Sequence, residues 1–117
     1  MNHRSERHGT VTVLIAAGRL DFSAAAGFQS EVEKLVGAND GTTALVIDCT
    51  GLEYVSSAGL RVFMLAARNC QRSGRYFAVC ALQHAVREVF ELSGFGQIIP
   101  LHADLATALA AAQSRHA

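Results

Sequence analysis

A run of consecutive apolar residues near the middle of the chain, Leu45, Val46 and Ile47, limits the folds open to this sequence. A strand with one face in water alternates apolar and polar residues, so an unbroken run is typical of a strand covered on both faces. Strands of that kind belong to sheets whose crossover connections are helices. The stretch TALVIDC, residues 43–49, is therefore predicted to be an interior strand of an α/β domain.

Strand patterns and helix patterns alternate along the rest of the chain. Period-two alternation over 11–15 predicts a strand, as does the apolar stretch 75–82, and the short stretch 97–101 is predicted to be extended. Pro100 restricts this last piece to a sheet edge. Apolar residues at three- and four-residue steps predict helices at 24–37, 57–74, 84–94 and 103–115. The polar residues 2–9 are either an edge strand or a tail.

Capping residues set the predicted helix ends. Ser23 is the predicted N-cap of the first helix, and Asp104 is the predicted N-cap of the last. Gly37 or Gly41 is expected to end the first helix, and Gly94 the third. The buried face of the first helix is predicted to consist of Phe28, Val32, Leu35 and Val36.

Length and charge narrow the class of protein. A chain of 117 residues is long enough for one domain with a real core. Ten Lys and Arg balance ten Asp and Glu, which argues against non-specific binding to nucleic acid and against binding to an anionic membrane. The first ten residues lack the apolar core of a signal peptide, and no stretch approaches the roughly 20 apolar residues of a membrane span.

The cysteines indicate a reducing compartment. Cys49, Cys70 and Cys80 have no CxxC spacing, their number is odd, and each lies in an apolar stretch. We expect them to pack as small hydrophobic residues in a cytoplasmic protein.

Residue patterns for enzyme chemistry are weak. Asp48 resembles a phosphate-accepting aspartate, but the only lysine is Lys34 and no acidic pair follows the first strand, so Asp48 is predicted to bond a loop. The SGFG stretch around Gly94 follows a helix and is predicted to be a turn rather than a dinucleotide site. Ser57 with His84 or His102 lacks a nucleophile elbow. We predict no enzyme activity, no metal and no cofactor.

Two adjacent serines, Ser56 and Ser57, stand at the predicted strand-to-helix junction. A serine there either caps the helix, which is common, or carries a phosphoryl group, which the free N–H groups and the helix dipole would stabilise. Ala58 and Gly59 add little bulk around the hydroxyl groups, so another protein's active site could approach.

The helix that follows carries a basic stripe. Arg61, Arg68 and Arg72 share one face, with Leu65 among them and Met64 at the border. This pattern suits either docking to an acidic, partly apolar partner surface or a helix face that keeps its arginines in water.

Three stretches together resemble a known family: residues 6–21 (ERHGTVTVLIAAGRLD), 45–63 (LVIDCTGLEYVSSAGLRVF) and 80–95 (CALQHAVREVFELSGF). They are similar to stand-alone anti-sigma factor antagonists of the STAS domain family. The resemblance implies one STAS domain over residues 1–117. Its expected fold is a mixed β-sheet of about four or five strands, with about four helices packed mainly on one side.

The resemblance also implies a phosphorylation switch. In the family, a partner anti-sigma factor with serine-kinase activity phosphorylates the serine that corresponds to Ser57, and the unphosphorylated antagonist binds that partner and releases a sigma factor. A metal-dependent serine phosphatase reverses the step. Well-studied members have aspartate where this chain has Ser56, and its absence removes one charge and one strong hydrogen-bond acceptor. Because the two hydroxyl groups are adjacent, Ser56 is kept as a second candidate for the acceptor. The implied partner-binding residues are Asp21, Ser56, Ser57, Ala58, Gly59, Arg61, Met64, Leu65 and Arg68.

A second function stays open. Some STAS domains are cytosolic partners of lipid or anion transporters, in which the same helix docks to an ATPase and no phosphate is involved.

Overall fold

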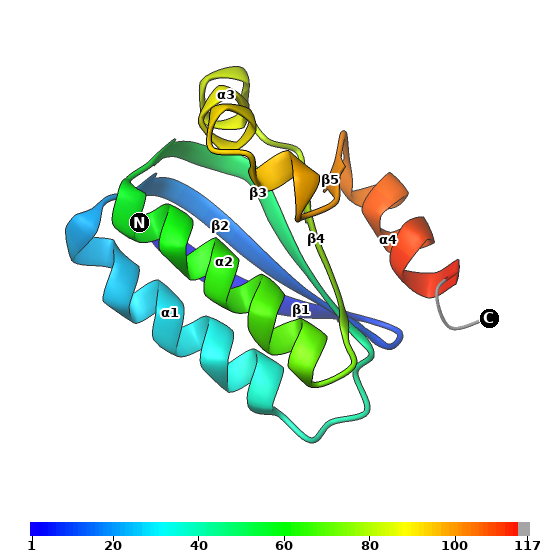
Figure 1. Ribbon diagram of the computed structural model, residues 1–117. Helices are drawn as coiled ribbons and strands as arrows, with labels where there is room; N and C mark the ends of the chain where they lie inside the picture. The colour runs from blue at the N-terminus through cyan, green and yellow to red at the C-terminus, as the bar shows by residue number, and fades with distance from the viewer. Residues whose placement is uncertain (115–117) are drawn as a thin grey trace.

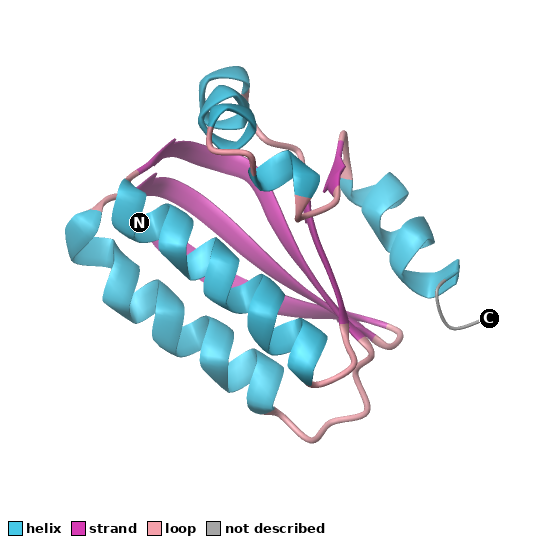
Figure 2. Ribbon diagram, in the orientation of Figure 1, coloured by secondary structure: helices cyan, strands magenta, loops and turns pink. Residues whose placement is uncertain are grey.

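The computed structural model describes residues 1–114, which form a five-stranded sheet with helices on both faces (Figure 2). The strands are β1 (Asn2–His8), β2 (Val11–Leu20), β3 (Ala44–Val55), β4 (Tyr76–Cys80) and β5 (Leu101–His102). The helices are α1 (Phe22–Gly37), α2 (Ser57–Arg72), α3 (His84–Leu92) and α4 (Leu105–Ser114), with a short 3₁₀ helix, η1, at Phe95–Gln97.

The strands lie in the order β1-β2-β3-β4-β5, and the sheet is mixed. β1 pairs antiparallel with β2, in a hairpin whose ends are His8 and Val11. Gly9, with φ of +64°, adopts the left-handed conformation in this tight turn. β2, β3, β4 and β5 pair in parallel. The choice left open for the N-terminal residues is thus decided: they form an edge strand.

Helices cover the two faces of the sheet unequally (Figure 1). α1, α2 and α3 pack on one face and α4 on the other, which confirms the expected α/β fold with helices mainly on one side. On the three-helix face, Phe63 of α2 lies 4.9 Å from Phe90 of α3 and 5.8 Å from Phe28 of α1, measured between ring centroids. This aromatic row holds the three helices over one continuous core.

The apolar run of β3 is covered on both faces, as its sequence predicts. Leu45 and Ile47 point into the core beneath α1, α2 and α3. Val46, between them, points into the smaller core beneath α4, where Ala108 and Ala112 are fully buried. Side chains of a strand alternate between faces, so only a run without polar interruption can fill both cores.

Several predicted boundaries were wrong. The N-cap of α1 is Asp21 rather than Ser23: an Asp21 carboxylate oxygen accepts from the Ala24 N–H at 3.0 Å, and the Ser23 hydroxyl donates to the same oxygen. β3 continues to Val55, six residues beyond the predicted stretch. α1 ends at Gly37, one of the two glycines expected.

The other differences lie near the C-terminus. The edge strand after Pro100 is only Leu101–His102, and Gln97 belongs to η1. The predicted last helix includes residue 115, which lies outside the described residues. Its N-cap is as predicted, because the Asp104 carboxylate accepts from the Thr107 N–H at 2.8 Å.

All three cysteines are buried and unpaired, as the sequence predicts. Burial raises the pKa of Cys70 and of Cys80 to about 12, and it also raises the pKa of Cys49. These thiols therefore pack as apolar groups and stay protonated at neutral pH.

Candidate functional site

The candidate site lies where β2 and β3 end and α1 and α2 begin. Leu20, the last residue of β2, is the register partner of Val55, the last residue of β3. The Ser56 N–H donates to the Leu20 carbonyl at 2.8 Å, which ties the two connections together. The N-termini of α1 and α2 consequently lie side by side at one end of the sheet (Figure 1). We call residues 55–59 the β3–α2 junction.

The two serines of the junction have different environments. Ser56 is the N-cap of α2, and its hydroxyl oxygen accepts from the Gly59 N–H at 3.1 Å. Ser57 is the first residue of α2, and its side chain is exposed. Within residues 1–114 no hydrogen bond engages the Ser57 hydroxyl. Ser56 therefore caps the helix, and Ser57 presents the accessible hydroxyl group.

Gly59 brings the first turn of α2 into direct contact with the end of β2. A Cβ added at Gly59 would lie 2.7 Å from Cγ of the buried Leu20 and 3.0 Å from its carbonyl oxygen. Only glycine fits so close to a backbone atom. Gly59 is buried and Ala58 is half-buried, so Gly59 positions the junction and does not contribute to the accessible surface.

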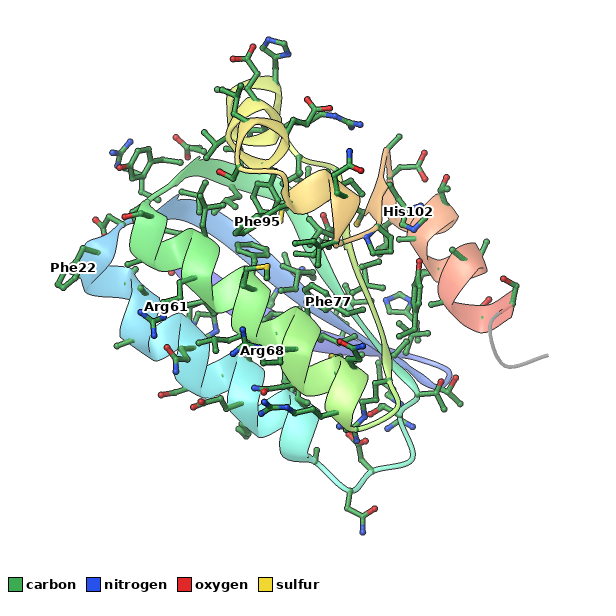
Figure 3. All side chains as sticks on the ribbon, in the orientation of Figure 1. Phe22, Arg61, Arg68, Phe77, Phe95 and His102 are labelled. Atoms are coloured by element: carbon green, nitrogen blue, oxygen red, sulfur yellow. The ribbon has the colours of Figure 1, made fainter. Side chains whose placement is uncertain are left out.

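The basic stripe of α2 faces solvent. Arg61 and Arg68 are exposed and project from the outer side of the helix (Figure 3), and Arg72 is also exposed. Met64 and Leu65 are half-buried at their base. The ion pairs formed within residues 1–114 join residues of β1 or of α3, and none involves an arginine of α2. The charges of this stripe are therefore not neutralised within the fold.

A groove of about 640 Å³ runs beside the second half of α2. Met64 and Arg68 line one side, and Ile98 and Pro100 line the other. Arg75, which also lines it, is held by the fold, because its guanidinium donates to the carbonyl oxygens of residues 38 and 42.

Asp21 lies next to the junction, directly after the end of β2. Its carboxylate is engaged by its own helix, through the Ser23 hydroxyl and the Ala24 N–H. Hydrogen bonding to Ser23, and then to the Ala24 N–H, lowers the pKa of Asp21. The group is consequently ionised at neutral pH and restricted in orientation.

The other candidate groups do not assemble around Ser57. His84 lies 2.7 Å from Glu88 on the same helix, and His102 lies 3.2 Å from the Tyr76 hydroxyl; neither has a hydrogen bond to Ser57. The prediction that Asp48 bonds a loop was wrong, because Asp48 lies within β3 and accepts from the Thr50 N–H and hydroxyl of the same strand. No helix within residues 1–114 is both long enough and apolar enough to cross a membrane.

Sequence reasoning missed the aromatic residues at this end of the sheet. Phe22, the first residue of α1, is 83% exposed and projects outward (Figure 3). Tyr54, near the end of β3, is also exposed, and the Arg19 guanidinium lies 4.2 Å from its ring centroid. The first helix was predicted to start at residue 24, which left Phe22 in a loop. A predicted start at residue 22 would have included Phe22 in the helix, outside its buried face.

The STAS domain family profile matches residues 2–108, and the chain belongs to the STAS domain family. The anti-sigma-F factor antagonist RsfB of Mycobacterium tuberculosis is 30% identical over 102 residues, which cover 87% of this chain and 81% of RsfB. BtrV of Bordetella bronchiseptica, a candidate anti-sigma factor antagonist, is 41% identical over 73 residues, which cover 62% of this chain and 63% of BtrV.

A solved structure has the same fold. The crystal structure of an anti-sigma factor antagonist from Mycobacterium paratuberculosis superposes with a TM-score of 0.87 and 28% identity. The match covers 96% of this chain and 93% of that one.

Proposed function

We propose that this protein is an anti-sigma factor antagonist that is switched off by phosphorylation of Ser57. In the unphosphorylated state it binds a serine-kinase anti-sigma factor in the cytoplasm and so releases a sigma factor. The observation that carries the proposal is the exposed Ser57 hydroxyl, placed at a helix N-terminus beside a serine that already serves as the cap. The names of its relatives RsfB and BtrV support the same class of function.

The switch has a physical basis in the junction. A phosphoryl group adds a charge of about −1.5 to −2 at neutral pH. The free N–H groups and the dipole of α2 stabilise that charge, so the modified chain stays folded. The complex, in contrast, would have to desolvate a dianion at its interface. A loss of about 3 kcal/mol would weaken binding more than a hundredfold.

The chemistry of phosphoryl transfer would come from the partner, which supplies ATP, the metal ion and the catalytic base. This chain supplies the acceptor hydroxyl and the docking surface. We assign the docking surface to the exposed and half-buried members of the predicted set, and Gly59 shapes it from beneath. The docking residues are Asp21, Ser56, Ser57, Ala58, Arg61, Met64, Leu65 and Arg68. A metal-dependent serine phosphatase would return the chain to the binding state.

The test uses a purified kinase-type anti-sigma factor, which is to be sought among the genes that neighbour the gene for this chain. With MgATP, intact-mass spectrometry should show one added phosphoryl group, mapped to Ser57. Ser57→Ala should bind the kinase and gain no mass. Ser56→Ala, the matched control, should lose about 1 kcal/mol of stability with its cap and still be phosphorylated.

Unchanged mass on the native chain, with binding that MgATP does not weaken, would contradict the proposal. Phosphate mapped to Ser56 would move the acceptor to the second candidate. If a pull-down with this chain recovered a transporter ATPase instead of a kinase, the result would favour the second function, a subunit that docks to a transporter ATPase.

A further inference from the structure

Within residues 1–114, Phe22 is the one phenylalanine that the fold leaves exposed to water. Among the described residues the other phenylalanines are buried or half-buried, and the aromatic row described above includes several of them. Phe22 is 83% exposed and has no ring partner within residues 1–114. Single exposed apolar residues are common, so the exposure of Phe22 does not by itself indicate a binding role. Its position in the fold is the feature that indicates one.

Phe22 and Ser57 occupy equivalent positions in the fold. Leu20 and Val55 are register partners at the ends of parallel strands, and neighbouring strands lie about 5 Å apart. Phe22 is two residues beyond Leu20 and Ser57 is two residues beyond Val55, and each is the first residue of its helix. The two side chains therefore stand at the N-termini of adjacent helices that leave the sheet in the same direction.

A protein that phosphorylates Ser57 must cover this end of the molecule. A standard interface covers about 800 Å² on each partner, which corresponds to a disc with a radius of about 16 Å. A disc of that size centred on Ser57 includes the N-terminus of α1, as well as Arg61 one turn along α2. Aromatic residues, phenylalanine among them, are enriched in the buried core of interfaces, and the residues that dominate affinity cluster near the centre in desolvated pockets.

We propose that Phe22 is the apolar anchor by which this chain binds the kinase that acts on Ser57. The partner that fits has an apolar pocket for the phenyl ring beside its active site, and carboxylates opposite the unpaired arginines of α2. This inference rests on the proposed function and adds to it the determinant of partner affinity. It also connects the anchor with the switch, because a phosphate on Ser57 would have to be desolvated next to an apolar pocket.

The test compares variants in calorimetric titrations with the same anti-sigma kinase. Phe22→Ala should weaken binding about 30-fold, as expected for an interface hot spot. Phe22→Leu should recover most of the affinity. Leu92→Ala on α3 is the matched control, since Leu92 is 87% exposed, and it should change the dissociation constant by less than about threefold. Because Phe22 is exposed, circular dichroism should show that Phe22→Ala stays folded.

Phosphorylation kinetics separate an anchor from a catalytic effect. Phe22→Ala should raise KM for this chain and leave the rate at saturation unchanged. Unchanged affinity in Phe22→Ala, or equal weakening in Leu92→Ala, would overturn the inference and leave the proposed function standing, provided that Ser57 is still phosphorylated. Failure of the wild-type chain to bind the kinase would overturn both.

Discussion

Replacing Gly59 with alanine tests whether the β3–α2 junction is held by close packing. The added methyl group would lie 2.7 Å from Cγ and 2.9 Å from Cδ2 of Leu20, and 3.0 Å from its carbonyl oxygen. Leu20 is fully buried and its carbonyl already accepts from the Ser56 N–H, so neither group can move away easily. The first turn of α2 must therefore shift outward.

The magnitude follows from two opposing effects. Overpacking of a buried site costs about 1–3 kcal/mol, and alanine in a helix is favoured over glycine by up to about 1 kcal/mol. We expect Gly59→Ala to lose about 1–2 kcal/mol of unfolding free energy, which lowers Tm by roughly 4–8 °C. Urea unfolding followed by circular dichroism measures the free energy, and calorimetry measures Tm.

Gly27→Ala is the matched control, because a Cβ at Gly27 would meet no atom within 4 Å. It should raise the stability of α1 by up to about 1 kcal/mol. If Gly59→Ala proved as stable as the wild type, the close contact between α2 and β2 would not be the constraint that places Ser57, and the reasoning about the junction would be wrong.

Two further predictions concern ionisable groups. Hydrogen bonds from the Thr42 and Thr107 side chains lower the pKa of Asp40 and Asp104, as those from Ser23 and Ala24 do for Asp21. The stability that depends on these carboxylates is present above the unfolded pKa of about 3.9 and is lost as the pH falls further, toward the folded values. The urea midpoint should accordingly stay constant from about pH 5 to 7 and fall below about pH 4. The fall should be less steep in Asp104→Asn, and an equal slope in that variant would show that Asp104 does not contribute to it. Because burial raises the pKa of the cysteine thiols, a thiol reagent at pH 8 should label the folded chain far more slowly than the urea-unfolded chain, and equal rates would show that the thiols are accessible.

Local patterns in the sequence determined most of the elements. The apolar run of β3, the apolar stripes of the helices and the cap at Asp104 depend on residues a few positions apart, so they can be read without knowledge of the fold. The resemblance to the STAS family then supplied the arrangement of these elements. The serine pair was recognised as the candidate site for the same reason, since it stands between a strand pattern and a helix pattern.

Only the tertiary structure decided which serine of the junction caps α2 and which one is exposed. Ser56 and Ser57 carry the same hydroxyl group, and their environments differ because the Ser56 hydroxyl accepts from the Gly59 N–H while Ser57 is exposed to solvent. Gly59 is buried because the end of β2 lies against α2, which is a contact between segments almost forty residues apart. The exposure of Phe22 likewise depends on the start of α1 and on which groups lie nearby. Burial is a property of all the surrounding segments together, so a pattern within one segment does not determine it.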